Sequence, residues 1–94
     1  PERKIAVECE NLDDCEALLM AGSDVVQCDK FTPEAVKQAA DLRDKIAPNA
    51  ALVASGGINL KNVREFAGTG ADALVTSAMY TQGMADITAI LEIA

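Results

Sequence analysis

The sequence predicts an α/β fold of four consecutive βα units, the C-terminal half of an incomplete TIM-like α/β barrel. Four short apolar runs lack polar/apolar alternation, which is typical of parallel strands flanked by helices. Polar residues at corresponding points of the units, Glu8, Asp29, Ser55 and Ser77, lie 21, 26 and 22 residues apart. This spacing suits a barrel, in which eight units take about 200 to 250 residues. We therefore expect residues 1–94 to be a single partial domain of a longer chain.

The first two units are marked by strand-like runs and capping residues. Residues 4–9 are rich in strand formers, and residues 11–21 place apolar side chains on one helical face. A second strand is expected over residues 24–28. A second helix then begins at Pro33 with Thr32 as its N-cap, because Pro is favoured at the first helical position.

The last two units follow the same order. Residues 51–54 predict the third strand and residues 60–67 its helix, with Asn59 in the capping position. Residues 73–76 predict the fourth strand. Residues 84–92 are expected to form the last helix.

A Ser-Gly-Gly step after the third strand predicts a phosphate site. Gly56 and Gly57 let the backbone approach a ligand, and Ser55 adds a hydroxyl group. The first turn of the helix after Asn59 should direct free N–H groups toward the same point. Because barrel phosphate sites usually follow the last two strands, this position assigns the chain to the C-terminal half.

Two carboxylates end the first two strands. Glu8 and Asp29 beside a phosphate cradle suit metal-assisted chemistry on a phosphorylated substrate, since Mg²⁺ prefers carboxylates, water and phosphates. The same groups could instead hold ribose hydroxyls. Taken singly, each is as readily explained as a helix cap or a solvated loop residue. Other charged residues are expected on solvated faces or in caps: Glu10, Asp13, Asp14, Lys37, Arg43, Asp44 and Lys45.

Composition narrows the function classes. The net charge of −7 and the lack of a basic stripe argue against nucleic acid or an anionic membrane as partner. The absence of a long apolar run and of a signal peptide predicts a cytoplasmic protein. Three cysteines without CxxC spacing, in a chain with no histidine, argue against zinc. Cys9 and Cys28 are expected to be buried as small apolar residues.

A family resemblance rests on four strings in one register. The sequence resembles the C-terminal barrel of the quinolinate phosphoribosyltransferases, also called nicotinate-nucleotide pyrophosphorylases (carboxylating). Residues 1–5, 29–31, 76–78 and 85–87 are more similar still to the ModD branch, which is associated with molybdenum transport. The four strings are residues 7–12 (VECENL), 27–31 (QCDKF), 55–58 (SGGI) and 69–72 (TGAD).

The resemblance implies transfer of phosphoribosyl from phosphoribosyl pyrophosphate (PRPP) to a pyridine nitrogen, with Mg²⁺. It implies that Glu8 and Asp29 are the catalytic acidic pair near ribose and metal. Ser55, Gly56 and Gly57 would bind the 5′-phosphate. Ser77 stands where the family has a phosphate-facing glycine, and Tyr80 where it has a histidine. Because members of this family form dimers, the resemblance also implies a homo-oligomer.

Three hypotheses follow for function. The first is a phosphoribosyltransferase of which these 94 residues alone are inactive, because the chain lacks the cations that a polyanionic substrate needs. The second is a non-catalytic ModD-type anion-binding protein linked to molybdenum transport. The third is a sugar-phosphate isomerase or aldolase, for which Lys30 is the only candidate Schiff-base lysine near a strand end.

Overall fold

The protein is described here by a computed structural model, which covers residues 6–78 and 87–92, with side chains for residues 6–76. It contains one five-stranded sheet in the order β1-β2-β3-β4-β5. The first four strands run parallel, and β5 is antiparallel to β4. The elements in chain order are β1 (Ala6–Cys9), α1 (Leu12–Met20), β2 (Val25–Asp29), α2 (Pro33–Ile46), β3 (Ala51–Ser55), α3 (Val63–Phe66), β4 (Ala73–Ala78) and β5 (Ile87–Glu92).

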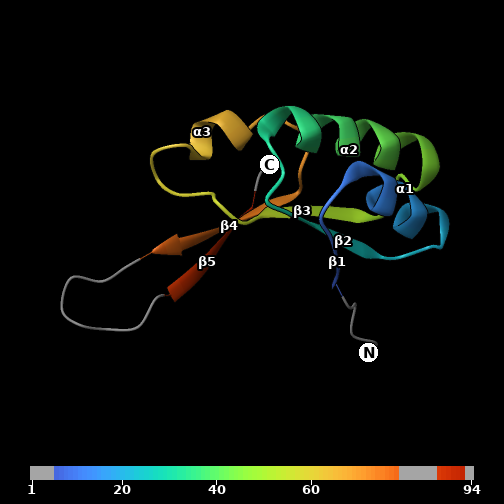
Figure 1. Ribbon diagram of the computed structural model, residues 1–94, viewed down its shortest axis with the longest axis horizontal. Helices are drawn as coiled ribbons and strands as arrows, with labels where there is room; N and C mark the ends of the chain where they lie inside the picture. The colour runs from blue at the N-terminus through green and yellow to red at the C-terminus, as the bar shows by residue number, and fades with distance from the viewer. Residues whose placement is uncertain (1–5, 79–86, 93–94) are drawn as a thin grey trace.

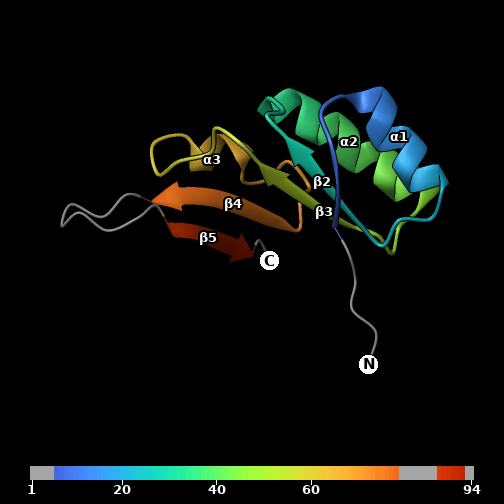
Figure 2. The same cartoon turned by 60° about the horizontal axis from the view of Figure 1, so that its bottom comes forward.

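The fold class predicted from the sequence is confirmed. Four parallel strands alternate with three helices, and all three helices lie on the same side of the sheet (Figures 1 and 2). Strand bounds agree with the predicted ones to within one or two residues at the ends that the structure describes. Residues 4–5 of the first predicted strand, and Tyr80, lie outside the described residues.

Side-chain caps explain where the first two helices begin. Asn11 Oδ1 accepts a hydrogen bond of 2.8 Å from the Asp14 N–H at the start of α1. Thr32 Oγ1 accepts one of 3.1 Å from the Ala35 N–H, and Pro33 follows it at the start of α2. Both contacts satisfy an N–H that has no partner inside its own helix.

The core lies between the sheet and the helices. Alternate strand residues are fully buried there, and small side chains of α1 and α2 cover them. Alanine and cysteine allow the helices to approach the strands closely. The fully buried large side chains are Leu19, Val26, Val36, Leu52 and Leu74.

The apolar strand runs predicted a sheet covered on both faces, but the helices cover only one face (Figure 1). On the face away from the helices, Val25, Gln27 and Val53 are half-buried and Glu8 is exposed. In a closed barrel this face is the interior, which all eight units fill together. Four units leave part of it open.

The last predicted helix is wrong where the structure describes it. Ile87–Glu92 forms β5, which pairs along the whole of β4, whereas residues 84–86 lie outside the described part. β-Branched Ile87, Thr88 and Ile90 favour a strand. The free edge of β4 offers unpaired backbone groups to any such segment.

The helix of the third unit is shorter than predicted. Residues 60–67 were expected to be helical, but α3 covers only Val63–Phe66 and residues 60–62 form turns. Asn59 still caps the turns that lead into α3, because its Oδ1 accepts hydrogen bonds from the N–H groups of Lys61 and Asn62 at 2.8 and 3.0 Å. These two donors are therefore occupied within the loop.

Arg43 was expected on a solvated face and is instead 8% exposed. Its Nη1 donates to Asp72 Oδ2 at 2.7 Å, and its Nη2 donates to the Gly70 carbonyl at 2.8 Å. Asp72 Oδ2 also accepts from the Leu52 N–H at 2.7 Å. The guanidinium thus links α2 to the loop before β4, at the end of the sheet opposite the predicted site. The helical periodicity of α2 alone does not reveal that link.

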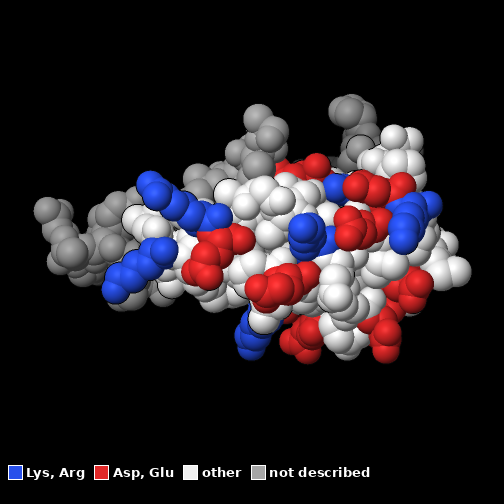
Figure 3. Space-filling model, turned by 90° about the horizontal axis from the view of Figure 1, so that it is seen from above, with Lys and Arg blue, Asp and Glu red and all other residues white. Residues whose placement is uncertain are grey.

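The helix-covered face carries charges of both signs. Figure 3 shows acidic and basic side chains interspersed over the helices on this face. Among the residues described, no helix is both long and apolar enough to cross a membrane.

Candidate active site at the carboxyl ends of the strands

Strand register brings the predicted site residues onto one face of the sheet. Glu8 pairs with Gln27, and Asp29 pairs with Ser55, on neighbouring parallel strands. Because side chains two residues apart on a strand share a face, all four side chains lie on the face away from the helices. This face corresponds to the inside of a barrel.

Asp29 and Ser55 meet at the ends of β2 and β3. Ser55 is 6% exposed, and its Oγ lies 3.4 Å from Asp29 Oδ1. Gln27 Nε2 donates a hydrogen bond of 2.9 Å to the same Ser55 hydroxyl. The predicted neighbourhood of Asp29 and Ser55 is therefore present, with the serine hydroxyl held between an amide and a carboxylate.

Gln27 is a site residue that the sequence reasoning did not assign. It belongs to the string 27–31, on which the family resemblance rests in part, but the sequence alone indicates no role for it. Its position two residues before Asp29 places it on the same strand face. That spacing was the available signal, and only the register with β3 shows that its partner is Ser55.

Gly56 and Gly57 turn the chain away from β3 in a conformation that side chains rarely adopt. Their φ angles are +81° and +79°. A Cβ on Gly56 would collide with Asp29 Oδ1 and would lie 2.8 Å from the Lys30 N atom, whereas a Cβ on Gly57 would meet nothing within 4 Å. Gly56 is therefore required for the close approach of the two strand ends, and Gly57 for backbone conformation alone.

The N–H groups of this turn remain available to a ligand. Neither the Gly56 nor the Gly57 N–H makes a hydrogen bond to another described residue. The Gly57 carbonyl accepts from Asn62 Nδ2 at 2.7 Å, which fixes the orientation of the turn. The N–H donors that were expected from the next helix are not available in the same way, because the Lys61 and Asn62 N–H groups already donate to Asn59 Oδ1. The predicted cradle is thus reduced to the glycine turn and Ser55.

Lys30 adopts an unusual backbone conformation beside this turn. Its φ is +63°, the one positive value among the described non-glycine residues. Its N–H donates a hydrogen bond of 2.7 Å to the Ser55 carbonyl, which continues the β2–β3 ladder past the end of β2. Backbone strain of this kind costs about 1 to 3 kcal/mol and is concentrated at functional sites.

A groove of about 250 Å³ opens next to Lys30. It lies between the loop after β1 and the loop after β2, on the side of the strand ends. Its lining combines apolar side chains with the polar Glu10 and Asn11 of the first loop and the cation Lys30 of the second. Its lining residues are Glu10, Asn11, Leu12, Lys30, Phe31, Thr32 and Ala35.

Glu8 and Ser77 lie farther from the Asp29–Ser55 contact. Glu8 is exposed, and its register partner is Gln27. Sheet spacings therefore place its Cα about 8 Å from that of Asp29. Ser77 belongs to β4, where its backbone pairs with Thr88, and its side chain lies outside the described part. The structure brings Asp29, Ser55 and Gly56 together, with Glu8 one strand away.

The strand-end arrangement defines a class of protein. An acidic side chain, a hydroxyl group and a Gly-Gly turn at the carboxyl ends of parallel strands are features of (β/α) barrels that handle anionic ligands. The chain belongs to the family described as quinolinate phosphoribosyl transferase, C-terminal domain, which matches residues 1–88.

Curated relatives agree with that family. The chain is 44% identical over 92 residues to the "Putative pyrophosphorylase ModD" of Pasteurella multocida, covering 98% of this chain and 33% of the relative. It is 40% identical over 80 residues to the nicotinate-nucleotide pyrophosphorylase [carboxylating] of Rattus norvegicus, covering 84% of this chain and 26% of the relative. The chain therefore spans about a third or less of these proteins.

Solved structures share the fold. The nicotinate-nucleotide pyrophosphorylase of Francisella tularensis is 26% identical with a TM-score of 0.71, over 96% of this chain and 32% of that one. The enzyme of the same name from Ehrlichia chaffeensis is 31% identical with a TM-score of 0.68, over 80% of this chain and 26% of that one. The interpretation of the four units as part of a larger TIM-like fold is confirmed.

Proposed function

We propose that the protein containing this chain is a phosphoribosyltransferase, which moves phosphoribosyl from PRPP to a pyridine-carboxylate acceptor. The observation that carries the proposal is the contact of Asp29 with Ser55 beside the Gly56 turn. Family membership and the names of the relatives support the same chemistry. The closer match to a ModD protein leaves the identity of the acceptor to experiment.

In this proposal the glycine turn binds the 5′-phosphate. The Gly56 and Gly57 N–H groups are open donors, and the Ser55 hydroxyl lies beside them. Backbone donors with no side chain in the way can reach a phosphate oxygen at hydrogen-bond distance. Ser77, which replaces a glycine of the family, would border the same phosphate from β4.

The acidic pair would act on the sugar. As the C1–oxygen bond to pyrophosphate breaks, positive charge develops on the ribose ring. The Asp29 carboxylate, held at the rim of the phosphate cradle, would stabilise that charge, and Glu8 would contribute from the next strand. The pyridine nitrogen then forms the new bond to C1 as pyrophosphate leaves.

The donor set fits Mg²⁺. Glu8 and Asp29 offer carboxylate oxygens, and Mg²⁺ is commonly held by one or two carboxylates together with substrate phosphates. Bound with PRPP, the ion would supply charge neutralisation for the leaving pyrophosphate.

The site would be completed by other parts of the protein. The chain carries a net charge of −7, and Lys30 is the one cation that lines the groove. PRPP and a pyridine dicarboxylate together carry several negative charges, so further arginine or lysine side chains are needed. We therefore propose a cytoplasmic homodimer in which the 94 residues alone are inactive, as expected for an incomplete barrel.

A second candidate function is anion binding without transfer, as a ModD-type protein linked to molybdenum transport. The composition of the groove favours it, because Lys30 is the one cation among the lining residues and a dicarboxylate acceptor needs more than one. It predicts that PRPP or molybdate binds to the complete protein without release of pyrophosphate.

The test is a PRPP-dependent assay of the complete protein, with pyrophosphate release as readout and quinolinate or nicotinate as acceptor. Asp29→Asn should lower kcat by roughly 100-fold or more while PRPP still binds, because the lost charge acts in the transition state. Asp41→Asn, on the exposed face of α2, is the charge-matched control and should leave kcat unchanged. Tight binding with no pyrophosphate release from the unaltered protein would favour the second candidate.

A further inference from the structure

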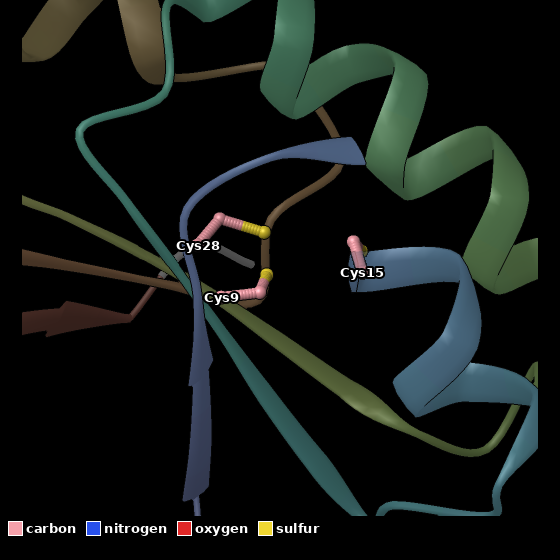
Figure 4. Close-up of side chains that lie close together, drawn as sticks. All are labelled: Cys9, Cys15 and Cys28. Carbon is pink, nitrogen blue, oxygen red and sulfur yellow. The ribbon is translucent and has the colours of Figure 1, made fainter. Parts of the chain in front are cut away.

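Three buried cysteines converge between the sheet and α1. Cys9 comes from β1, Cys15 from α1 and Cys28 from β2. They are 3%, 0% and 0% exposed, and their Sγ atoms all lie within 4.8 Å of one another. Figure 4 shows the Cys9 and Cys28 side chains next to each other, with Cys15 on the neighbouring helix α1. All three thiols are free.

The topology explains this convergence. Cys9 and Cys28 are direct register partners on neighbouring parallel strands, so their side chains share the helix-covered face. Cys15 lies one turn into α1, on the side that packs against these strands. The three residues are 6 and 13 positions apart in sequence, spacings that match no metal-binding motif.

The sulfur separations suit a three-coordinate metal ion. With metal–sulfur bonds of about 2.3 Å, a trigonal site needs sulfur atoms about 4 Å apart. The separations here need to contract by less than about 1 Å to reach that value. Small side-chain rotations provide such shifts without movement of the backbone.

The donor set selects the type of ion. Thiolate ligands favour soft ions such as Cu(I), whereas structural zinc takes four ligands. The chain contains no histidine, and no carboxylate joins the three sulfurs among the described residues. The apolar surroundings also favour an ion that sheds its water easily.

We propose that Cys9, Cys15 and Cys28 form a buried three-coordinate site for a soft monovalent metal ion of the Cu(I) class. On binding, three metal–sulfur bonds form, and each thiol that loses its proton releases it to solvent. The metal keeps its oxidation state and no sulfur is oxidised. The site lies on the helix-covered face, separate from the strand-end site on the open face.

The test is anaerobic titration of the complete, reduced protein with Cu(I) in competition with the chelator bathocuproine disulfonate. We expect one Cu(I) per chain bound through this cluster, with X-ray absorption showing three sulfur neighbours at about 2.2 to 2.3 Å. Cys15→Ala should weaken the affinity by about 100-fold, as a lost ligand must cost at least as much as a lost second-shell partner. The triple variant, with all three cysteines changed to alanine, should lose the bound ion.

Val26→Ala is the matched control, because Val26 is fully buried on β2 and its loss leaves a core cavity without removing a thiol. This variant should bind Cu(I) as the unaltered protein does, which separates lost ligands from lost stability. Retention of Cu(I) by the triple variant, or fewer than three sulfur neighbours in the unaltered protein, would overturn the proposal. The proposal would also be overturned if the unaltered protein could not take Cu(I) from the chelator, because the three cysteines would then be packing residues only.

Discussion

A side chain on Gly56 would collide with the Asp29 carboxylate, so the end of β3 and the end of β2 can approach only through a glycine. The same glycine has a φ of +81°, which places it in the left-handed region. The phosphate turn and the acidic residue are therefore one structural unit, which a single methyl group would separate.

Gly56→Ala should weaken PRPP binding to the complete protein by at least about tenfold, because the added methyl group displaces Asp29 and the turn. Strain from the positive φ should also lower the free energy of unfolding by about 1 kcal/mol or more. Isothermal titration and thermal unfolding measure the two effects.

Gly22→Ala is the control for this variant. Gly22 has a φ of +90° and open space around its Cβ position, at the end of α1. It should lose comparable stability with no change in PRPP affinity. Equal losses of affinity in the two variants would contradict a specific role for the Gly56–Asp29 contact.

Gln27→Ala should lower kcat/KM by roughly tenfold, because the Ser55 hydroxyl then loses the donor that orients it. The stability cost should be about 1 kcal/mol, the usual net value of one hydrogen bond. Steady-state kinetics and chemical denaturation are the measurements. Gln38→Ala on the exposed side of α2 should change neither quantity, and an equal kinetic effect there would rule out the proposed role of Gln27.

Lys30→Gly should separate backbone strain from charge. Removal of the side chain at φ +63° should raise the free energy of unfolding by up to about 1 kcal/mol. Loss of the cation that lines the groove should at the same time weaken PRPP binding. Lys30→Met keeps the strain and loses the charge, so it should weaken binding without the gain in stability. Unchanged affinity in both variants would exclude Lys30 from the site.

Arg43→Met should destabilise the fold without affecting the site. The guanidinium is buried and bonds to Asp72 and to the Gly70 carbonyl. Its removal takes the donor from the Gly70 carbonyl and leaves Asp72 with the Leu52 N–H alone. A loss of about 2 to 3 kcal/mol is expected by denaturation, with KM for PRPP unchanged. Lys37→Met, which removes an exposed charge from the same helix, should cost less than about 0.5 kcal/mol. A selective change in KM for the Arg43 variant would show that it reaches the site.

Much of the fold could be predicted because its signals are local. Apolar runs, the cap at Thr32, and the regular spacing of the units identify the strands and helices in order. The last segment could not be placed in this way. Whether Ile87–Glu92 pairs with β4 depends on which neighbour occupies that edge, and that is a long-range question.

The candidate site was predictable where it depends on strand ends, and less so where it depends on register. Asp29 and Ser55 could be placed together because carboxyl ends of parallel strands share an edge. The Gln27 contact, the burial of Arg43 and the meeting of the three cysteines each join residues from different elements. Sequence periodicity reports which face a residue occupies, but not which partner it finds there.

We propose above all that the turn at Gly56 and Gly57 holds the phosphate of a phosphoribosyl substrate beside Asp29. A crystal structure of the complete protein with PRPP tests it most directly. We predict 5′-phosphate oxygens at about 3 Å from the Gly56 and Gly57 N atoms, with the ribose facing the Asp29 carboxylate. A 5′-phosphate bound elsewhere, with these two N–H groups facing only water, would contradict the account.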